Sequence, residues 1–179
     1  GFIYSLAAAK SMMKVLNFQN ALIITVDPYS KIIEKSDKNT ALLFGDAAAA
    51  IWVSAQSNNE ILKFSFGTDG SGFDKLIVRC GGSKTTFRKI TETETATEAD
   101  DPYLRMDGRA IFEFMMKQVP VDMASCLLKN NLTMAGVDYF VFHQASRYML
   151  KNLQKQMKIP DNKMVFFLKI NTLKKTIIV

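Results

Sequence analysis

A single histidine is the residue in this sequence best placed to do chemistry near neutral pH. His143 ends an apolar stretch at residues 139–142 that predicts a strand, and it precedes a run with helical spacing at residues 146–158. Ligands of α/β proteins gather at the carboxyl ends of strands, and histidine has the side-chain proton affinity nearest neutral pH. The position suits a functional histidine. A lone histidine is usually structural, however, so both interpretations stay open.

The two cysteines are the other candidates for nucleophilic chemistry. Cys80 and Cys126 are far apart, and neither has the partner of a Cys-x-x-Cys motif. Together with ten methionines they suit a reducing cytosol, and we interpret both as structural thiols. We expect no metal site.

Two glycine-rich segments, residues 67–72 and 81–84, invite a phosphate-binding interpretation. A phosphate loop joins a strand to a helix, whose first amide groups hold the anion. No Gly-Lys-Ser/Thr follows the first segment, and the residues after it predict a strand. A tight turn is therefore the better prediction, and the second segment has the same weakness.

The elements that must position these residues alternate between helices and strands. Phe2–Leu16 is apolar almost all round and predicts a buried helix, and residues 21–26 predict a buried strand. Further strands are predicted at residues 40–44, 48–53, 61–66, 76–78, 139–142 and 164–168, and further helices at residues 109–130, bent at Pro120, and 146–158. This order predicts α/β layering, with polar residues 91–100 forming a loop between two halves.

Charge is unevenly distributed along the 179 residues. The net charge of +6 comes entirely from the second half, and residues 147–175 carry eight basic groups and one acid. Such a patch suits a nucleic acid, an anionic membrane, a phosphate-bearing cofactor or an acidic protein, whereas a solvated helix face explains individual lysines equally well. The aromatic residues lie in apolar runs and are not interleaved with the cations, which disfavours nucleic acid. No apolar run is long enough to span a bilayer.

Several motifs resemble those of one enzyme family. Phe142-His143-Gln144-Ala145 resembles the histidine motif of β-ketoacyl-acyl-carrier-protein synthase III, a thiolase-like condensing enzyme. Residues 1–10 are similar to the stretch after the family's nucleophilic cysteine, residues 40–50 to its Phe-Gly-Asp-Gly-Ala-Gly-Ala segment, residues 67–76 to its Gly-Thr-Asp-Gly-Ser-Gly-Tyr-Asp-Lys-Leu stretch, and residues 106–112 to its Met-x-Gly-x-x-Val-Phe. The resemblance covers nearly the whole chain in the family's order.

The resemblance implies a thiolase-like layered α/β/α fold that is incomplete in this chain. Residues 1–100 would be the C-terminal part of the N-terminal half, and residues 101–179 a truncated C-terminal half. The family's nucleophilic cysteine would lie two positions before Gly1. We therefore expect a fragment of a longer enzyme that is inactive alone.

The implied activity is that of a 3-oxoacyl-[acyl-carrier-protein] synthase III, an acyltransferase of fatty acid biosynthesis. A cysteine at a helix N-terminus would take the acyl group of an acyl-CoA such as acetyl-CoA, and malonyl-acyl carrier protein would lose CO2 in a decarboxylative Claisen condensation. His143 would be one hydrogen-bond donor to the enolate oxygen, and Asn171 the second. Asn171 is similar to the asparagine of the family's Gly-Asn-Thr-Ser, although Ile170 and Leu173 replace its glycine and serine.

The same resemblance implies binding residues. Lys38 stands where synthases often place an arginine on the CoA side, Phe112 matches a phenylalanine that lines the pantetheine tunnel, and Ser146 replaces the asparagine of His-Gln-Ala-Asn. Arg147, Lys151 and Lys155 lie on a helix that resembles the basic docking surface for the acidic carrier protein. Core packing for Phe112 and solvation for the cations are the alternatives.

The implied partners are acyl carrier protein, acyl-CoA and malonyl thioesters, in a cytoplasmic homodimer. We expect no tightly bound cofactor, no nucleic acid and no membrane. Two other functions stay open: a non-catalytic pseudoenzyme that keeps the basic helix for carrier-protein binding, and a related polyketide or hydroxymethylglutaryl-CoA synthase.

Overall fold

The computed structural model describes residues 1–56, 59–83, 97–166 and 176–178. They form two compact units. The first contains Gly1–Thr25, Ala48–Gly67 and the described residues of Met115–Val179, and the second contains Val26–Ala47 and the described residues of Thr68–Phe114. This division does not test the assignment of residues 1–100 and 101–179 to two halves of a family fold, which stays a prediction. Within the described ranges, no helix is both long enough and apolar enough to cross a membrane.

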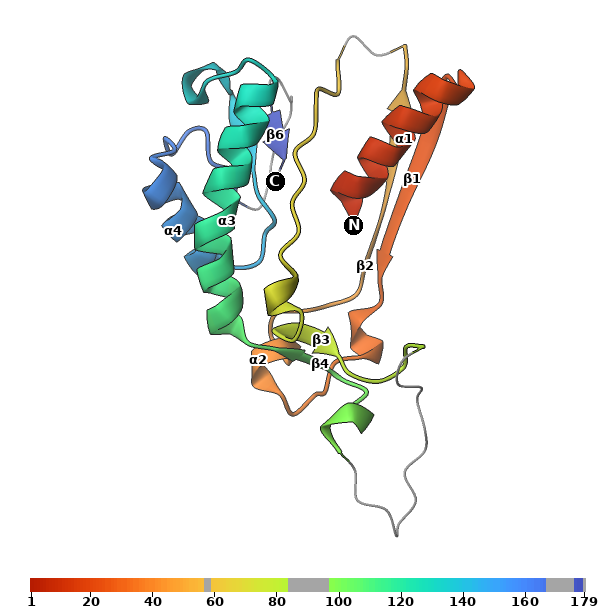
Figure 1. The fold of residues 1–179 in the computed structure, drawn as a ribbon, viewed down its shortest axis with the longest axis vertical. Coiled ribbons are helices and arrows are strands. Elements are labelled where there is room, and N and C mark those ends of the chain that lie inside the picture. The colour runs from red at the N-terminus through yellow and green to blue at the C-terminus, as the bar shows by residue number, and fades with distance from the viewer. Residues whose placement is uncertain (57–58, 84–96, 167–175, 179) are drawn as a thin grey trace. The chain divides into compact units, whose positions relative to one another are not determined.

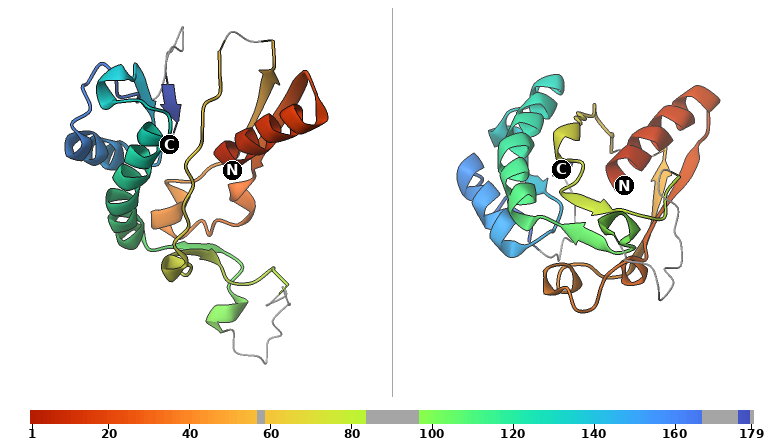
Figure 2. Two further views of the ribbon diagram at one scale, coloured as in Figure 1. Left: turned by 45° about the horizontal axis from the view of Figure 1, so that its top comes forward. Right: turned by 60° about the horizontal axis from the view of Figure 1, so that its bottom comes forward.

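The first unit begins with a helix beside a pair of strands. Helix α1 (Phe2–Leu16) ends at Asn17, which has the left-handed conformation (φ 56°) that asparagine tolerates better than most residues. Strand β1 (Asn20–Asp27) pairs with β2 (Ala47–Ser54), and the Ala55 N–H donates to the Gln19 carbonyl at 2.9 Å. Figures 1 and 2 show α1 lying alongside this pair.

Burial of α1 and β1 differs from the prediction. Only Met13 in α1 and Ile23 in β1 are buried. Val15, Leu22 and Ile24 are more than half exposed in the described structure. The prediction that these two elements are buried is therefore wrong here. An apolar side chain is buried only where other residues pack against it, and composition alone does not show whether they do.

The main core of the first unit lies between two helices and a short strand. Helix α3 (Gly108–Lys129) and helix α4 (Arg147–Met157) lie side by side (Figures 1 and 2), and the Gln156 side-chain amide donates to the Met116 carbonyl at 3.1 Å. Strand β5 (Tyr139–Val141) pairs in parallel with β6 (Thr176–Ile178). The apolar core cluster consists of Met123, Leu127, Val137, Phe140, Phe142, Leu150, Leu153, Ile159 and Met164.

The second unit is built around an arginine. Strand β3 (Leu76–Val78) pairs antiparallel with β4 (Leu104–Met106), near the short helix α2 (Lys38–Ala41). In β4, the Arg105 guanidinium donates to the carboxylates of Asp101 and Glu34, both at 2.5 Å, and lies 4.0 Å from that of Asp37. We call these four residues the Arg105 network. Short 3-10 turns at Tyr29–Lys31, Gly70–Gly72 and Glu98–Asp100 complete this unit, and a fourth, Met134–Gly136, precedes β5 in the first.

Most predicted elements are confirmed, but the strand predicted at residues 40–44 is wrong. The chain forms helix α2 there. The Asp37 carboxylate accepts from the Asn39 N–H at 3.0 Å and from the Thr40 hydroxyl at 2.9 Å, so this acid caps the helix and overrides the β propensity of the residues after it.

The strand predicted at residues 61–66 is also wrong. This extended segment binds side chains where a strand would bind a neighbouring backbone. The Lys10 ammonium donates to the carbonyls of Ile61 and Leu62, the latter at 3.2 Å, and the Asn130 amide group both accepts from and donates to the Lys63 backbone at 2.9 and 3.0 Å. Of the strand predicted at residues 164–168, the described part makes one bridge, between Met164 and Phe140. Residues 167–168 and most of the predicted loop at residues 91–100 lie outside the described residues.

Candidate active site

His143 lies two residues beyond the end of β5 and four before α4. The segment that carries it is anchored on both sides, because Phe142 and Leu150 are buried in the apolar core cluster. The His143 side chain itself is exposed. Among the residues that the structure describes, none makes a hydrogen bond or an ion pair with its ring.

Gln144 stabilises the turn that carries His143. Its side-chain nitrogen donates to the carbonyl of Phe142 at 2.9 Å and to the carbonyl of Val165 at 3.3 Å. The sequence indicated Gln144 only as part of the histidine motif. A primary amide directly after the sole histidine, at the carboxyl end of a strand, is the signal that could have shown this role.

Ser146 caps helix α4. Its backbone is extended (φ −159°), and its hydroxyl accepts from the Met149 N–H at 3.2 Å. Serine and asparagine are both strong N-cap residues. The replacement of the asparagine in the expected motif therefore keeps a capping group at this position.

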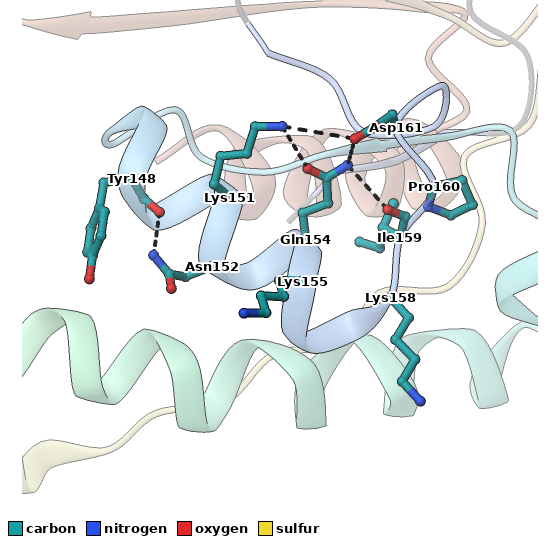
Figure 3. Close-up of a pocket in the computed structure, with 9 residues that line it drawn as sticks. All are labelled: Tyr148, Lys151, Asn152, Gln154, Lys155, Lys158, Ile159, Pro160 and Asp161. Carbon is teal, nitrogen blue, oxygen red and sulfur yellow. Dashed lines mark hydrogen bonds and ion pairs between the residues drawn. The ribbon is translucent and has the colours of Figure 1, made fainter.

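Three cations follow Ser146 along one face of α4. Arg147, Lys151 and Lys155 are spaced by four residues and are exposed. A shallow pocket beside them is lined by Tyr148, Lys151, Asn152, Gln154, Lys155, Lys158, Ile159, Pro160 and Asp161 (Figure 3). Three of these lining side chains are cationic and one is anionic, so the surface suits a negatively charged partner.

Figure 3 also shows which of these groups are already paired. The Gln154 amide donates to Ile159 and Asp161 at 3.2 and 2.9 Å, and the Lys151 ammonium lies 3.3 Å from the Gln154 side-chain oxygen and 3.9 Å from the Asp161 carboxylate. In the described part of the chain, the Lys155 ammonium makes no hydrogen bond or ion pair. A ligand on this surface would meet Lys155 unpaired and would compete with Asp161 for Lys151.

The remaining predicted site residues belong to the second unit or lie outside the described residues. Lys38 begins helix α2 and is exposed, and Phe112 is half-buried in α3; both belong to the second unit. His143, Ser146 and the three cations belong to the first unit, on one continuous stretch of chain. Asn171 lies outside the described residues.

Neither cysteine occupies a nucleophile's position. Cys80 is buried and its thiol donates to the Asp100 carbonyl at 3.4 Å, whereas Cys126 is inside α3 with its thiol 3.8 Å from the Lys63 carbonyl. A thiolate activated by a helix dipole must lie at a helix N-terminus, and neither does. Among the described residues, no three His, Cys, Asp or Glu side chains come together as a metal site.

Two of the glycine-containing motifs include an aspartate whose carboxylate accepts hydrogen bonds from nearby loop residues. At residues 67–72 the Asp69 carboxylate accepts from the Ser71 N–H at 3.0 Å, which fits a turn and places a negative charge where a phosphate would bind. In Phe44-Gly45-Asp46, the Asp46 carboxylate accepts from the Ser30 hydroxyl at 2.6 Å and N–H at 2.7 Å, and these bonds lower the pKa of Asp46. Both acids therefore hold loops in place.

Comparison with known proteins agrees with these motifs. Residues 1–70 match the family model for 3-oxoacyl-[acyl-carrier-protein (ACP)] synthase III, and residues 127–171 match the model for the C-terminal part of the same enzyme. The chain belongs to the 3-oxoacyl-[acyl-carrier-protein] synthase III family. Relatives named β-ketoacyl-[acyl-carrier-protein] synthase III include those of Streptococcus mutans, 33% identical over 93% of this chain, and Streptococcus uberis, 32% identical over 91%.

Solved synthase III structures share the fold. A 3-oxoacyl-(acyl-carrier-protein) synthase III is 33% identical with a TM-score of 0.82 over 93% of this chain and 51% of its own, and the Pseudomonas aeruginosa enzyme is 27% identical with a TM-score of 0.73 over 92% and 48%. These matches confirm the thiolase-like α/β fold class. The chain spans about half the length of the synthase III relatives it matches, 51% and 48% of the two streptococcal enzymes.

Proposed function

We propose that this chain supplies part of a condensing enzyme that joins an acyl-CoA, such as acetyl-CoA, to malonyl-acyl carrier protein in fatty acid biosynthesis. The observation that carries the proposal is the family's histidine motif at the carboxyl end of β5, with an exposed imidazole on a turn anchored in the core. The matched regions make up about half of the relatives named for this activity. We therefore propose that the complete reaction also uses residues that this sequence does not contain.

The proposed reaction has two steps. A cysteine thiolate outside this sequence attacks the acyl-CoA thioester, forms an acyl-cysteine and releases CoA. Malonyl-carrier protein then loses CO2, and the electron pair of the broken carbon–carbon bond becomes an enolate. The enolate carbon attacks the acyl-cysteine, forms the new carbon–carbon bond and expels the cysteine thiolate. The product is a 3-oxoacyl-carrier protein, with no oxidant or reductant consumed.

His143 stabilises the enolate in this scheme. A neutral imidazole donates one N–H to the thioester oxygen that gains negative charge as CO2 leaves, and Asn171 provides the second donor. The exposed ring of His143 supports its part, since a donor already bonded to protein would first have to break that bond. No tightly bound cofactor is needed, because the acyl-CoA enters as a substrate.

Substrate recognition is divided among three groups of residues. Lys38 is proposed to contact the phosphates of CoA, and Phe112 to line the tunnel for pantetheine; the exposed ammonium of one and the half-buried ring of the other suit these roles. Ser146 is proposed to lie beside the tunnel while capping α4. Arg147, Lys151 and Lys155 are proposed to dock the acidic carrier protein. We also propose that the enzyme is a cytoplasmic homodimer.

The decisive experiment measures the two steps separately. In a synthase that contains this chain and the implied cysteine, His143→Ala is expected to slow malonyl-carrier-protein decarboxylation by about 100-fold or more, since one oxyanion donor is lost. Acylation of the cysteine, measured by intact mass, should stay close to that of the unmodified enzyme. Lys117→Ala on the exposed side of α3 is the control and should change neither step. Equal loss of both steps in the histidine variant would contradict the oxyanion role.

A second candidate is a carrier-protein-binding module without catalysis. The positions of Cys80 and Cys126 favour it for the chain by itself, since neither thiol lies at the start of a helix. The chain mixed with acetyl-CoA should then show no acetyl adduct by intact mass, yet should bind holo-carrier protein with an affinity that falls as salt is raised. Binding unaffected by both salt and Lys155→Glu would contradict the docking role.

A further inference from the structure

In the described part of the chain, the parallel pairing between β5 and the segment around Met164 is short. The Phe140 N–H donates to the Lys163 carbonyl at 2.8 Å, and the Val165 N–H donates to the Phe140 carbonyl at 3.2 Å. In a parallel ladder the next bond would run from the Phe142 N–H to the Val165 carbonyl. The described backbone hydrogen bonds do not include it.

The Gln144 side chain binds the Val165 carbonyl in place of the Phe142 N–H. Its amide nitrogen has two hydrogens, and it lies 3.3 Å from the Val165 carbonyl and 2.9 Å from the Phe142 carbonyl. Phe142 and Val165 are both buried, so carbonyl groups here need a partner from the protein. A side-chain amide thus replaces a backbone amide and frees the main chain to turn away from the sheet.

His143 lies in the chain between Gln144 and Phe142, one of the two residues whose carbonyls Gln144 binds. We infer that Gln144 is a positioning residue for His143: by closing the end of the β5 ladder it fixes the direction in which the imidazole leaves the turn. This inference rests on the proposed function of His143, but it concerns only the geometry of the turn.

The test uses the fact that His143 is the only histidine in the sequence, so its ring signals in an NMR spectrum are unambiguous. In Gln144→Met the side chain keeps its length but loses both donors. We expect the ring carbon relaxation of His143 to show large-amplitude motion that the unmodified chain lacks, and the rate of its modification by diethyl pyrocarbonate to change at least about threefold.

Gln154 provides a matched control. Its amide nitrogen also donates two bonds, to the Ile159 carbonyl and the Asp161 carboxylate, and it lies at the other end of α4. Gln154→Met removes a comparable pair of bonds. It therefore measures how far a general destabilisation of α4 changes the ring motion and the modification rate of His143. We expect its His143 signals and modification rate to match those of the unmodified chain.

Gln144→Glu is the second variant, and it keeps the test decisive if Gln144→Met does not fold. At neutral pH its carboxylate cannot donate, so it should mobilise the ring as Gln144→Met does. A ring that stays as ordered in both variants as in the unmodified chain, or that loosens equally in Gln154→Met, would overturn the inference. If His143→Ala did not slow decarboxylation, or slowed both steps equally, the proposed function would be overturned. The role of Gln144 in the geometry of the turn would be unaffected.

Discussion

The two units of this chain are stabilised by different forces. In the first unit, nine buried side chains from α3, β5, α4 and the loops around them form the apolar core cluster. In the second, the Arg105 network links β4 to three carboxylates, and few apolar side chains are buried. We therefore expect the stability of the first unit to depend on packing, and that of the second to depend on charge and to respond to salt and pH.

The sharpest test of the apolar core cluster compares two adjacent leucines of α3. Leu127 is 6% exposed and Leu128 is 78% exposed. Leu127→Ala should lower the free energy of local opening by about 2–4 kcal/mol, because it leaves a cavity in the core. Leu128→Ala should change it by less than about 0.5 kcal/mol. Hydrogen exchange of the α3 and α4 amides measures both, and similar losses in the two variants would contradict the packing described for α3.

The Arg105 network should respond to removal of its only cation. Arg105→Met leaves three carboxylates without their shared partner and should destabilise the β3–β4 pair by about 1–2 kcal/mol, a reduced figure because the pairs are partly exposed. Hydrogen exchange of the β3 and β4 amides reports the loss, which should diminish at high salt. Arg109→Met removes a fully exposed pair with Glu113 and should have no measurable effect. A salt-independent loss in Arg105→Met would show that packing, not charge, dominates this unit.

A smaller loss of stability is expected from substitution of Ser146, the polar residue that caps helix α4 in the first unit. Ser146→Ala should destabilise α4 by about 1 kcal/mol, because the Met149 N–H loses its acceptor. Ser146→Asn restores a capping group and should recover nearly all of that loss. Exchange of the first-turn amides of α4 measures both, and an asparagine variant as unstable as the alanine variant would contradict the capping role.

The smallest effect is a pH dependence confined to the second unit. Hydrogen bonding from Arg105 holds the pKa of Asp101 below its ordinary value of 3.8. Since the folded-state pKa is the lower one, this contribution to stability is fully present above about pH 4 and is lost as the pH falls through the folded-state value. Asp101→Asn should therefore destabilise the β3–β4 pair near neutral pH and progressively less in acid. A difference that stays constant across the acid range would contradict the pairing.

Local patterns predicted the long elements well. An almost wholly apolar run predicted α1, and helical spacing predicted α3 and α4, each to within one or two residues, because such apolar patterns are short-range signals. The same approach failed at residues 40–44 and 61–66, where the Asp37 carboxylate and the side chains of Lys10 and Asn130 determine the backbone conformation. Two of these three groups are distant in sequence from the segments they bind, so no local pattern contains them.

The sequence by itself determined the family and the order of its motifs, because these depend on which residues follow one another. It also predicted that His143 follows a strand and precedes a helix. Only the tertiary structure decided that the β5 ladder ends on the side chain of Gln144, that Arg105 gathers carboxylates from residues 34 to 101, and that much of α1 and β1 is exposed. Hydrogen bonds and burial depend on distances in space between residues far apart in the chain, which spacing along the sequence does not specify.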